Sequence, residues 1–222
     1  MHQSYEITMA MNRVIFMGDP NVGKTAILHR IINGAFNSTT NPTTSATYHS
    51  FQNDPNDDFI LQFWDTAGTE RYRSINRIYY RDAVAAIITF DFTSKKSFDS
   101  IDSWLNDFIE NGSVSDAIII LVGNKYDLIS SNSPIEENHQ NIDDDNDIKN
   151  ENYDDDYVVD ENVVAIWATS KSIPFFAVSA KSGEGIKELI SFLFQAIPRK
   201  TLSKTTSTTI LNETSEKKKK CC

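Results

Sequence analysis

The sequence predicts an α/β fold, with a six-stranded, mostly parallel sheet and helices on both faces. Short apolar runs alternate along the chain with stretches of helical spacing, which is typical of parallel strands joined by right-handed helical crossovers. One predicted hairpin adds an antiparallel edge strand, so the sheet is expected to be mixed. A chain of 222 residues, 40% of them hydrophobic, suits one sizeable domain with extensions.

The first half of the chain predicts a strand, a helix and a hairpin, in that order. Residues 12–17 form a mostly apolar run that ends at a glycine, which indicates a buried strand. A helix is expected from about 24 to 33. Residues 34–45 are rich in Ser, Thr, Asn and Pro, so they predict a loop. Residues 47–52 and 59–64 alternate with period two on either side of a turn, which predicts the hairpin.

The second half predicts three more strands, with helices between and after them. Residues 83–90 and 117–122 are continuous apolar runs, as expected for strands covered on both faces. Residues 95–109 place apolar side chains at helical intervals between these strands. A further buried strand is expected at 173–178, followed by an amphipathic helix at 184–197.

The charge of the chain is concentrated in one segment. Residues 136–161 hold twelve acidic residues and one lysine, which accounts for the whole net charge of −10. We therefore predict a domain over 11–198 with a disordered acidic insertion at about 130–158, a flexible arm at 1–10 and a tail at 199–222. The insertion is interpreted as a tolerated low-complexity expansion; an electrostatic docking strip or a trap for Mg²⁺ or Ca²⁺ is the alternative.

A phosphate-binding loop is predicted at Gly18–Thr25, which fits G-x-x-x-x-G-K-[ST] between a strand and a helix. Backbone N–H groups of the loop and the helix N-terminus would bind phosphate oxygens. Lys24 would neutralise the β- and γ-phosphates, and the Thr25 hydroxyl would bind Mg²⁺. An ordinary glycine turn with a surface lysine is the alternative. The residues expected to hold the phosphates are Asn21, Val22, Gly23, Lys24, Thr25 and Ala26.

Asp65 and Gly68 predict a second contact with the same phosphates. Asp65 ends an apolar strand, where a carboxylate is costly unless it has a partner, and through a water it could hold Mg²⁺. Gly68 has no side chain to keep its N–H from the γ-phosphate. A simple turn at the end of a strand is the alternative.

Two further segments predict recognition of guanine. The Asp127 carboxylate, in the run Asn124–Lys125–Tyr126–Asp127, could accept from guanine N1–H and the 2-amino group, a pair of donors that adenine lacks. This tetrad argues against an ATP-dependent P-loop kinase. In Ser179–Ala180–Lys181, the Ala180 N–H would meet guanine O6 and Lys181 would line the edge of the base. Each segment alone could be an ordinary turn.

Together these residues resemble the small GTPases of the Ras superfamily, and most closely the Rab family. Residues 64–75 resemble the Rab switch II signature, 79–83 resemble its Tyr-Tyr-Arg-Gly-Ala run, and 60–64 resemble the strand before it. The resemblance covers about residues 12–198 and implies the Ras-like P-loop NTPase fold. It also implies a switch that binds and hydrolyses GTP with Mg²⁺ and regulates vesicle traffic.

The resemblance implies roles for residues that no motif above includes. Phe36 would lie edge-on near the base, and Thr43 in switch I would bind Mg²⁺ and the γ-phosphate. Tyr48, Trp64 and Tyr79 would form an aromatic patch read by effectors, or would simply pack in the core. Exchange factors, GTPase-activating proteins and effectors would bind at switch I (about 36–48) and switch II (about 66–80), and no nucleic acid is expected.

The chain departs from the family at three places near the phosphates. Thr69 stands where the family usually has a Gln that orients the attacking water, so intrinsic hydrolysis is expected to be slow. A GTP-locked binding module with negligible hydrolysis is the alternative. Pro20 lies inside the phosphate loop and lacks an N–H. Thr44 and Ser45 are more polar than the usual switch I residues, which leaves the effector open.

The C-terminal residues resemble a Rab lipidation site. Lys217–Lys220 precede Cys221 and Cys222, which would both be geranylgeranylated. Two lipid chains give a stable anchor where one gives marginal binding, and the lysines favour anionic lipid. A charged solvated tail with chance cysteines is the alternative. We expect a lipid-anchored protein on the cytoplasmic face of an intracellular membrane, with a soluble cytosolic pool; residues 72–75 and 85–87 favour endosomal relatives.

Overall fold

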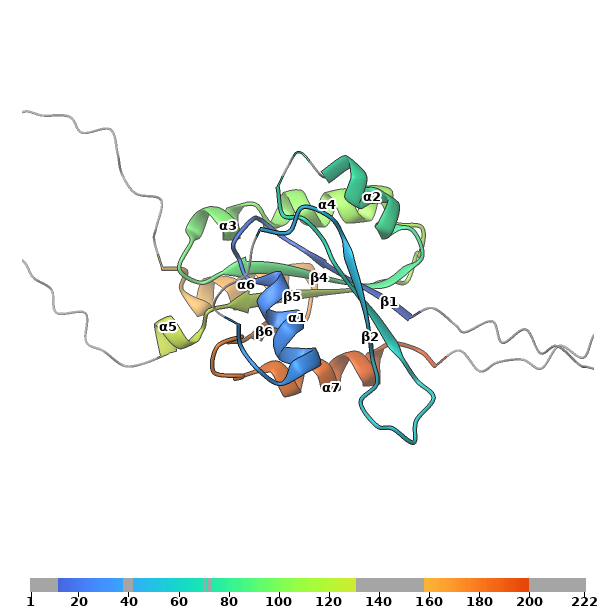
Figure 1. Ribbon diagram of the computed structural model, residues 1–222. Coiled ribbons are helices and arrows are strands. Elements are labelled where there is room, and N and C mark those ends of the chain that lie inside the picture. The colour runs from blue at the N-terminus through green and yellow to red at the C-terminus, as the bar shows by residue number, and fades with distance from the viewer. Residues whose placement is uncertain (1–11, 38–41, 70, 72, 131–157, 200–222) are drawn as a thin grey trace, which may run out of the picture.

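The protein has one six-stranded mixed sheet, which confirms the predicted fold class (Figure 1). The computed structural model describes residues 12–37, 42–69, 71, 73–130 and 158–199. The strands lie in the order β2-β3-β1-β4-β5-β6, and all neighbours are parallel except the β2–β3 hairpin at the edge. They are β1 (Asn12–Met17), β2 (Thr47–Phe51), β3 (Leu61–Asp65), β4 (Ala83–Asp91), β5 (Ile118–Asn124) and β6 (Phe175–Ala177).

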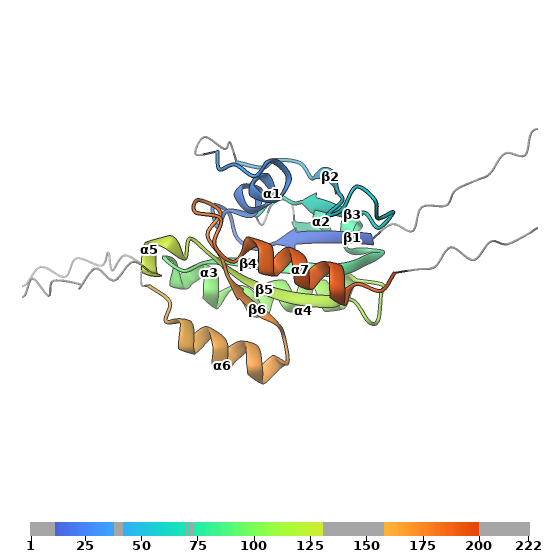
Figure 2. The same cartoon turned by 90° about the horizontal axis from the view of Figure 1, so that it is seen from below.

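Helices cover both faces of the sheet. In chain order they are α1 (Lys24–Asn33), α2 (Arg73–Tyr80), α3 (Lys95–Asp99), α4 (Ile101–Asn111), α5 (Asp127–Ser130), α6 (Glu161–Lys171) and α7 (Ile186–Ala196). The helices α1 and α7 pack on one face, while α2, α4 and α6 pack on the other. Seen from below, α6 lies beside β6, at the edge of the sheet away from β2 (Figure 2).

Alternating side chains of the strands build two hydrophobic cores. In β1, Val14 and Phe16 join the core under α1 and α7, whereas Ile15 and Met17 join the core under α4 and α6. All four side chains are fully buried. Successive residues of a strand point to opposite faces, so a continuous apolar run is what a sheet covered on both sides requires.

Two predicted elements differ from the observed ones for local reasons. The helix expected at 95–109 is divided at Ser100, whose hydroxyl donates to the Ser97 carbonyl at 3.0 Å. Such side-chain bonds to the backbone compete with the regular helical ladder. The strand expected at 173–178 is shorter, because the Ile173 N–H instead donates to the Ala168 carbonyl of α6 at 2.9 Å.

Three helices were not predicted from the sequence. Helix α2 buries only Asn76 and Tyr80 and leaves Ile75 and Ile78 exposed. Helix α6 buries Val164 and Ala168 and is capped by Asp160, whose side chain accepts from the Asn162 N–H at 2.8 Å. Helix α5 is a single four-residue turn. None of these three described helices has the long stripe of buried apolar residues that identifies a helix in a sequence.

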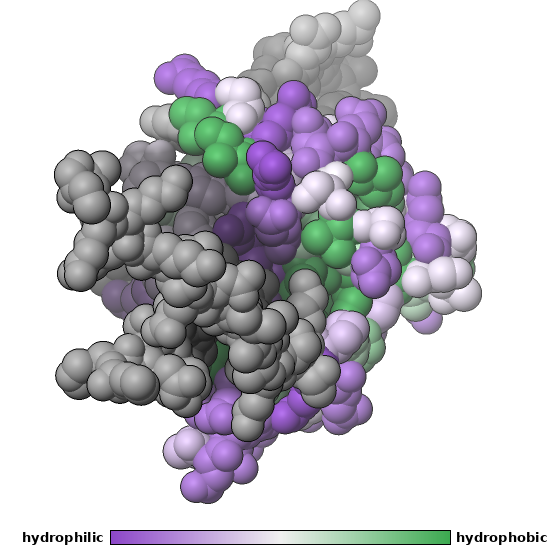
Figure 3. Space-filling view, turned by 90° about the vertical axis from the view of Figure 1, so that its right-hand side faces the viewer, coloured by the Kyte–Doolittle hydropathy of each residue, from purple (hydrophilic) through white to green (hydrophobic). Residues whose placement is uncertain are grey.

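The surface of the described residues is mixed in character. Viewed from the side of the β2–β3 hairpin, hydrophobic residues on the uncovered part of the face form small groups among hydrophilic ones (Figure 3). Among the helices in the described ranges, none has the length and hydropathy that crossing a bilayer demands. The predicted arm at 1–10, nearly all of the predicted insertion, and the tail beyond Arg199 lie outside the described residues.

Candidate nucleotide-binding site

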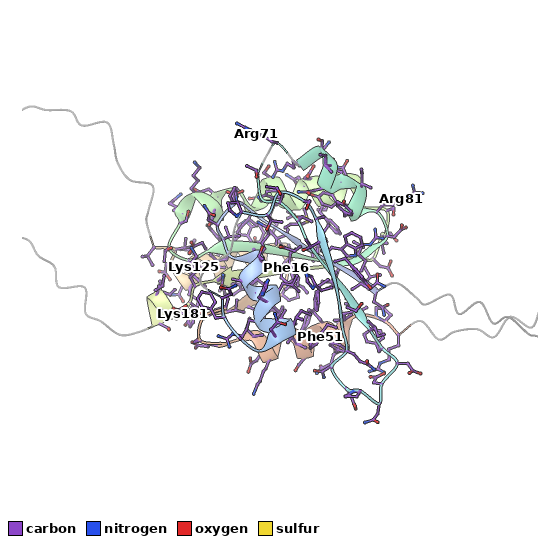
Figure 4. All side chains as sticks on the ribbon, viewed as in Figure 1. Phe16, Phe51, Arg71, Arg81, Lys125 and Lys181 are labelled. Atoms are coloured by element: carbon purple, nitrogen blue, oxygen red, sulfur yellow. The ribbon has the colours of Figure 1, made fainter. Side chains whose placement is uncertain are left out.

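The predicted site residues lie in loops at one edge of the sheet. Neighbouring strands from β3 through β1, β4 and β5 to β6 are parallel, so their carboxyl ends lie at the same edge of the sheet. Ligands of open α/β sheets bind at this edge. Lys125 and Lys181 lie at this end of the molecule, beside α5, whereas Arg81 lies at the opposite end (Figure 4). A cleft at this edge is lined by Pro20, Asn21, Gly23, Lys24, Thr25, Ala26, Pro42, Thr43, Gly68 and Thr69.

The phosphate loop holds Lys24 as a buried cation. Gly23 has a φ of 93°, and a Cβ there would lie 2.2 Å from the Asn124 side-chain nitrogen, so only glycine fits. The Lys24 Nζ donates to the carbonyls of Gly18 and Asp19, each at 2.8 Å. Burial lowers the pKa of Lys24 to about 8, although the charges of Asp65 and Asp19 oppose that shift. An anion in the cleft would favour the charged form of Lys24 and raise its pKa again.

Three oxygen-bearing side chains converge beside this lysine. The Thr25 hydroxyl donates to Asp65 Oδ2 at 2.6 Å and lies 2.9 Å from the Thr43 hydroxyl. Thr43 also donates to Asp65 Oδ2, at 3.3 Å. Burial raises the pKa of Asp65, against the two threonine hydrogen bonds and the charge of Lys24. Asp65 Oδ1 is buried without a hydrogen-bond partner. Hard oxygen donors of this kind, one of them unsatisfied, fit Mg²⁺.

Gly68 brings the segment after β3 against the phosphate loop. A Cβ at Gly68 would lie 2.6 Å from both the Asp19 carbonyl oxygen and the Lys24 Nζ. The backbone at this position therefore reaches the lysine that the motif assigns to the γ-phosphate. Thr69, the next residue, lines the same cleft.

Asn124 joins the phosphate loop to the loop after β6. Its side-chain nitrogen donates to the Val22 carbonyl at 2.9 Å, and its side-chain oxygen accepts from the Ala180 N–H at 3.1 Å. Asn124 is nearly fully buried, so both bonds are shielded from water. The Ala180 N–H, predicted to meet guanine O6, is thus already bonded to Asn124, and a base oxygen would have to share or replace that bond.

Asp127 is held by the second predicted base segment. The fully buried Ser179 donates its hydroxyl to Asp127 Oδ1 at 2.6 Å, and the Lys181 ammonium lies 3.8 Å from Asp127 Oδ2. Lys125, which has a φ of 63°, makes an ion pair of 2.5 Å with Asp91. The two base segments, separated by more than 50 positions in the sequence, therefore form one structure around a fixed carboxylate.

Comparison with known proteins gives the family. The model of the Ras family matches residues 13–199. The chain belongs to the Ras family of small GTPases. It is 32% identical over 195 residues to the Ras-related protein Rab7 of Cenchrus ciliaris, covering 86% of this chain and 82% of that protein.

Further relatives of this Ras-family chain match with similar identity and coverage. The GTP-binding protein YPT52 of Saccharomyces cerevisiae is 32% identical over 193 residues, with 82% of this chain and 79% of that protein covered. The Ras-related protein RABG3f of Arabidopsis thaliana is 32% identical over 195 residues, with 86% and 82% covered. The resemblance to the Rab family is confirmed.

Of the residues that the Rab resemblance adds, three aromatic ones lie on β2, β3 and α2. Phe36 follows α1 and is 40% exposed. The ring centroids of Tyr48 and Trp64 are 5.5 Å apart, and those of Trp64 and Tyr79 are 5.0 Å apart. Tyr48 is 48% exposed, so this Ras-family chain presents a connected aromatic patch that is not simply core.

Three residues around the site were missed by sequence reasoning. Arg30 donates to the Ala180 carbonyl at 2.7 Å. The Trp104 indole N–H donates to Asp19 Oδ1 at 2.7 Å. Asp91, the partner of Lys125, is a buried acid at the end of a strand, and this is the same signal that identified Asp65. The contacts of Arg30 and Trp104 span 150 and 85 positions of the chain, and no local sequence pattern predicts them.

Proposed function

We propose that this protein is a guanine-nucleotide-dependent switch that binds GTP with Mg²⁺, hydrolyses it to GDP and phosphate, and regulates vesicle traffic. The observation that carries the proposal is the meeting of four separate segments at one edge of the sheet, where Asp127 is fixed by Ser179. A carboxylate held in this way matches the two neighbouring donors of guanine and leaves adenine without a partner.

The phosphate side of the site has a clear division of roles. The loop from Asn21 to Ala26 offers backbone N–H groups, and the Lys24 ammonium would exchange its two carbonyl partners for phosphate oxygens. Thr25 and Thr43 would bind Mg²⁺ directly and Asp65 through a water, as their convergence supports. When bound, the ion would neutralise charge on the phosphates.

Switching follows from the two segments that share these contacts. Thr43 belongs to switch I and Gly68 to switch II, and both reach the Lys24–Thr25 end of the cleft. A γ-phosphate would hold both segments, and its loss would release them. The aromatic patch connects Tyr48 of switch I through Trp64 to Tyr79 of switch II, so effectors and regulators that bind it would distinguish the two nucleotide states.

Thr69 favours a second candidate for the output of the site. It lines the cleft where the attacking water would lie, but its side chain is short and has no amide to orient that water. Intrinsic hydrolysis is therefore expected to be slow, and a GTP-locked module that only binds effectors is the second candidate. A GTPase-activating protein that supplies its own residues would still allow stimulated hydrolysis.

We also propose lipid attachment at Cys221 and Cys222, which lie outside the described residues. The motif and the preceding lysines support attachment to a cytoplasmic membrane face, with endosomal membranes favoured. A variant with both cysteines changed to serine should move from the membrane to the soluble fraction of cells. Unchanged membrane association of that variant would remove this part of the proposal.

The proposed function is tested by the nucleotide that the purified protein carries. We expect chromatography of the denatured extract to show GDP or GTP. After loading with GTP and Mg²⁺, timed sampling should show slow conversion to GDP, whereas the locked module would show none. Recovery of adenine nucleotides alone would contradict both candidates.

A further inference from the structure

We propose that Arg30 is a positioning residue that holds the two segments on either side of the guanine base and thereby sets how long the nucleotide stays bound. This inference rests on the proposed function. None of the motifs contains Arg30, and its position in the last turn of α1 would otherwise suggest an ordinary surface residue.

The guanidinium group of Arg30 donates to three backbone carbonyls. Its Nε–H bonds to Ala180 O at 2.7 Å, one terminal nitrogen bonds to Lys181 O, and the other bonds to Gly34 O at 2.7 Å. Among the described residues, no ion pair links Arg30 to a carboxylate. The planar fork of five donors suits such a set of fixed acceptors.

These carbonyls belong to the two segments that would enclose the base. Ala180 and Lys181 lie beside Asp127, through the Ser179 hydroxyl and the Lys181 ammonium. Gly34 ends α1 two residues before Phe36, which is expected to lie against the base. Arg30 therefore joins the loop on one side of the base to the segment on the other side.

Helix α1 connects this clamp with the phosphate loop. Lys24 begins the helix, and Arg30 lies about 9 Å further along its axis. The phosphate loop is thus held at one end of the helix and the base loop is held through Arg30 near the other. The Asn124 side chain makes a parallel connection, from Val22 to Ala180. The distance between the phosphate and base subsites is therefore held by two separate connections, one through α1 and Arg30 and one through Asn124.

Loss of the guanidinium should free the base loop without opening the core. Arg30 is only partly buried, and its partners are main-chain oxygens that water can reach once the side chain is gone. Charge-assisted bonds are stronger than neutral ones. We expect faster release of guanine nucleotide, because the loop that presents Lys181 and braces Asp127 would no longer be held.

The test measures the dissociation rate of fluorescent methylanthraniloyl-GDP from the full chain with Mg²⁺. Arg30→Ala should raise this rate about tenfold, equivalent to about 1.4 kcal/mol. The dissociation rate of Arg30→Lys should lie between those of the wild type and Arg30→Ala, since one ammonium cannot span three carbonyls in a plane. Arg13→Ala is the matched control: Arg13 also donates to backbone carbonyls, of Arg81 at 2.5 Å and Tyr79 at 3.4 Å, at the end of the molecule opposite Lys181 (Figure 4).

Competition by unlabelled GDP and ADP distinguishes a loss of positioning at the base from a general loss of nucleotide binding. Arg30→Ala should lower the GDP-to-ADP affinity ratio by about the factor that it adds to the GDP dissociation rate. An unchanged dissociation rate would overturn the inference, and so would equal weakening of both nucleotides. A wild-type protein without preference for GDP would instead contradict the proposed function, and the inference with it.

Discussion

At the scale of single residues, the site holds two ionisable side chains where water cannot solvate their charged forms. Lys24 is buried with its ammonium on two carbonyls, and burial lowers its pKa to about 8. Asp65 is buried with one oxygen unsatisfied, and burial raises its pKa. Both shifts disfavour the charged form, so a ligand that brings phosphate and a cation would relieve both at once.

Binding of nucleotide should therefore be linked to the protonation of Lys24. Below pH 8 the lysine is protonated with or without ligand, so the affinity for GDP should vary little with pH. Above pH 8 the free protein has lost the proton that phosphate would retain in the complex, so binding takes up a proton and affinity falls as pH rises. Calorimetry at pH 8.5–9 in buffers of different ionisation enthalpy should show this uptake. Heats independent of the buffer would rule it out.

The substitution Thr69→Gln should accelerate hydrolysis. An amide at this position can orient water on the γ-phosphate, and we expect a gain of about tenfold to a hundredfold, or about 1.4–2.7 kcal/mol of barrier. Single-turnover hydrolysis of bound GTP measures it, with Thr69→Ser as the control that keeps a hydroxyl. A Gln variant no faster than the wild type would show that Thr69 does not limit the reaction.

At the scale of elements, α2, which lies in the proposed switch II, is fastened to α4 through Asp107. This nearly buried carboxylate makes an ion pair with Arg77 at 2.7 Å and accepts from the Tyr80 hydroxyl at 3.1 Å. Burial, followed by the charge of Asp107, raises the pKa of Tyr80, so the hydroxyl stays a donor. Arg73 adds a contact with Asp107 at 3.8 Å and stacks on Trp104.

The substitution Asp107→Ala should destabilise the protein by about 2 kcal/mol, since it leaves the buried Tyr80 hydroxyl without an acceptor and Arg77 without its anion. Urea unfolding at one fixed concentration of GDP and Mg²⁺ measures the change. The control is Asp99→Ala, which breaks only the exposed pair with Lys95 and should cost less than about 0.5 kcal/mol. Equal effects of the two substitutions would show that Asp107 is not an anchor.

The elements also show what a sequence can predict here. Strands such as β4 were predictable because a run of apolar residues has few other uses, and the phosphate loop was predictable because its spacing is a chemical requirement. Helix α2 was not predictable, since it is held by Asp107 and by the hydrogen bond from Asn76 to the Ala67 carbonyl. The contacts of Arg30 were not predictable either, because its partners are carbonyl oxygens that any residue could supply.

At the scale of the whole molecule, the acidic segment interrupts a domain that is fastened on both sides of it. On one side, the Tyr126 N–H donates to the Val178 carbonyl at 3.1 Å. On the other, the buried Val159 donates its N–H to the Phe92 carbonyl at 2.8 Å. Residues 131–157 lie outside the described part of the chain, and no described contact of the nucleotide site requires them.

Replacing residues 131–157 with a short Gly-Ser linker should leave GDP affinity within about twofold. Loop closure depends only weakly on loop length, so stability should change by less than about 1 kcal/mol. Displacement of fluorescent GDP measures the affinity, with an equally long, uncharged Gly-Ser replacement as the control for charge. Loss of GDP binding in both variants would show that the segment takes part in the site, against our interpretation of a tolerated expansion.

The proposed function depends on a nucleotide site that distinguishes purine bases through Asp127. The direct measurement is competition between GDP and ADP for the purified full-length protein with Mg²⁺, beside the variant Asp127→Ala. We predict a preference for GDP of about 10⁴-fold in the wild type, as for a site whose buried polar groups match one ligand only, and a largely lost preference in the variant. Equal affinity of the wild-type protein for the two nucleotides would contradict the account.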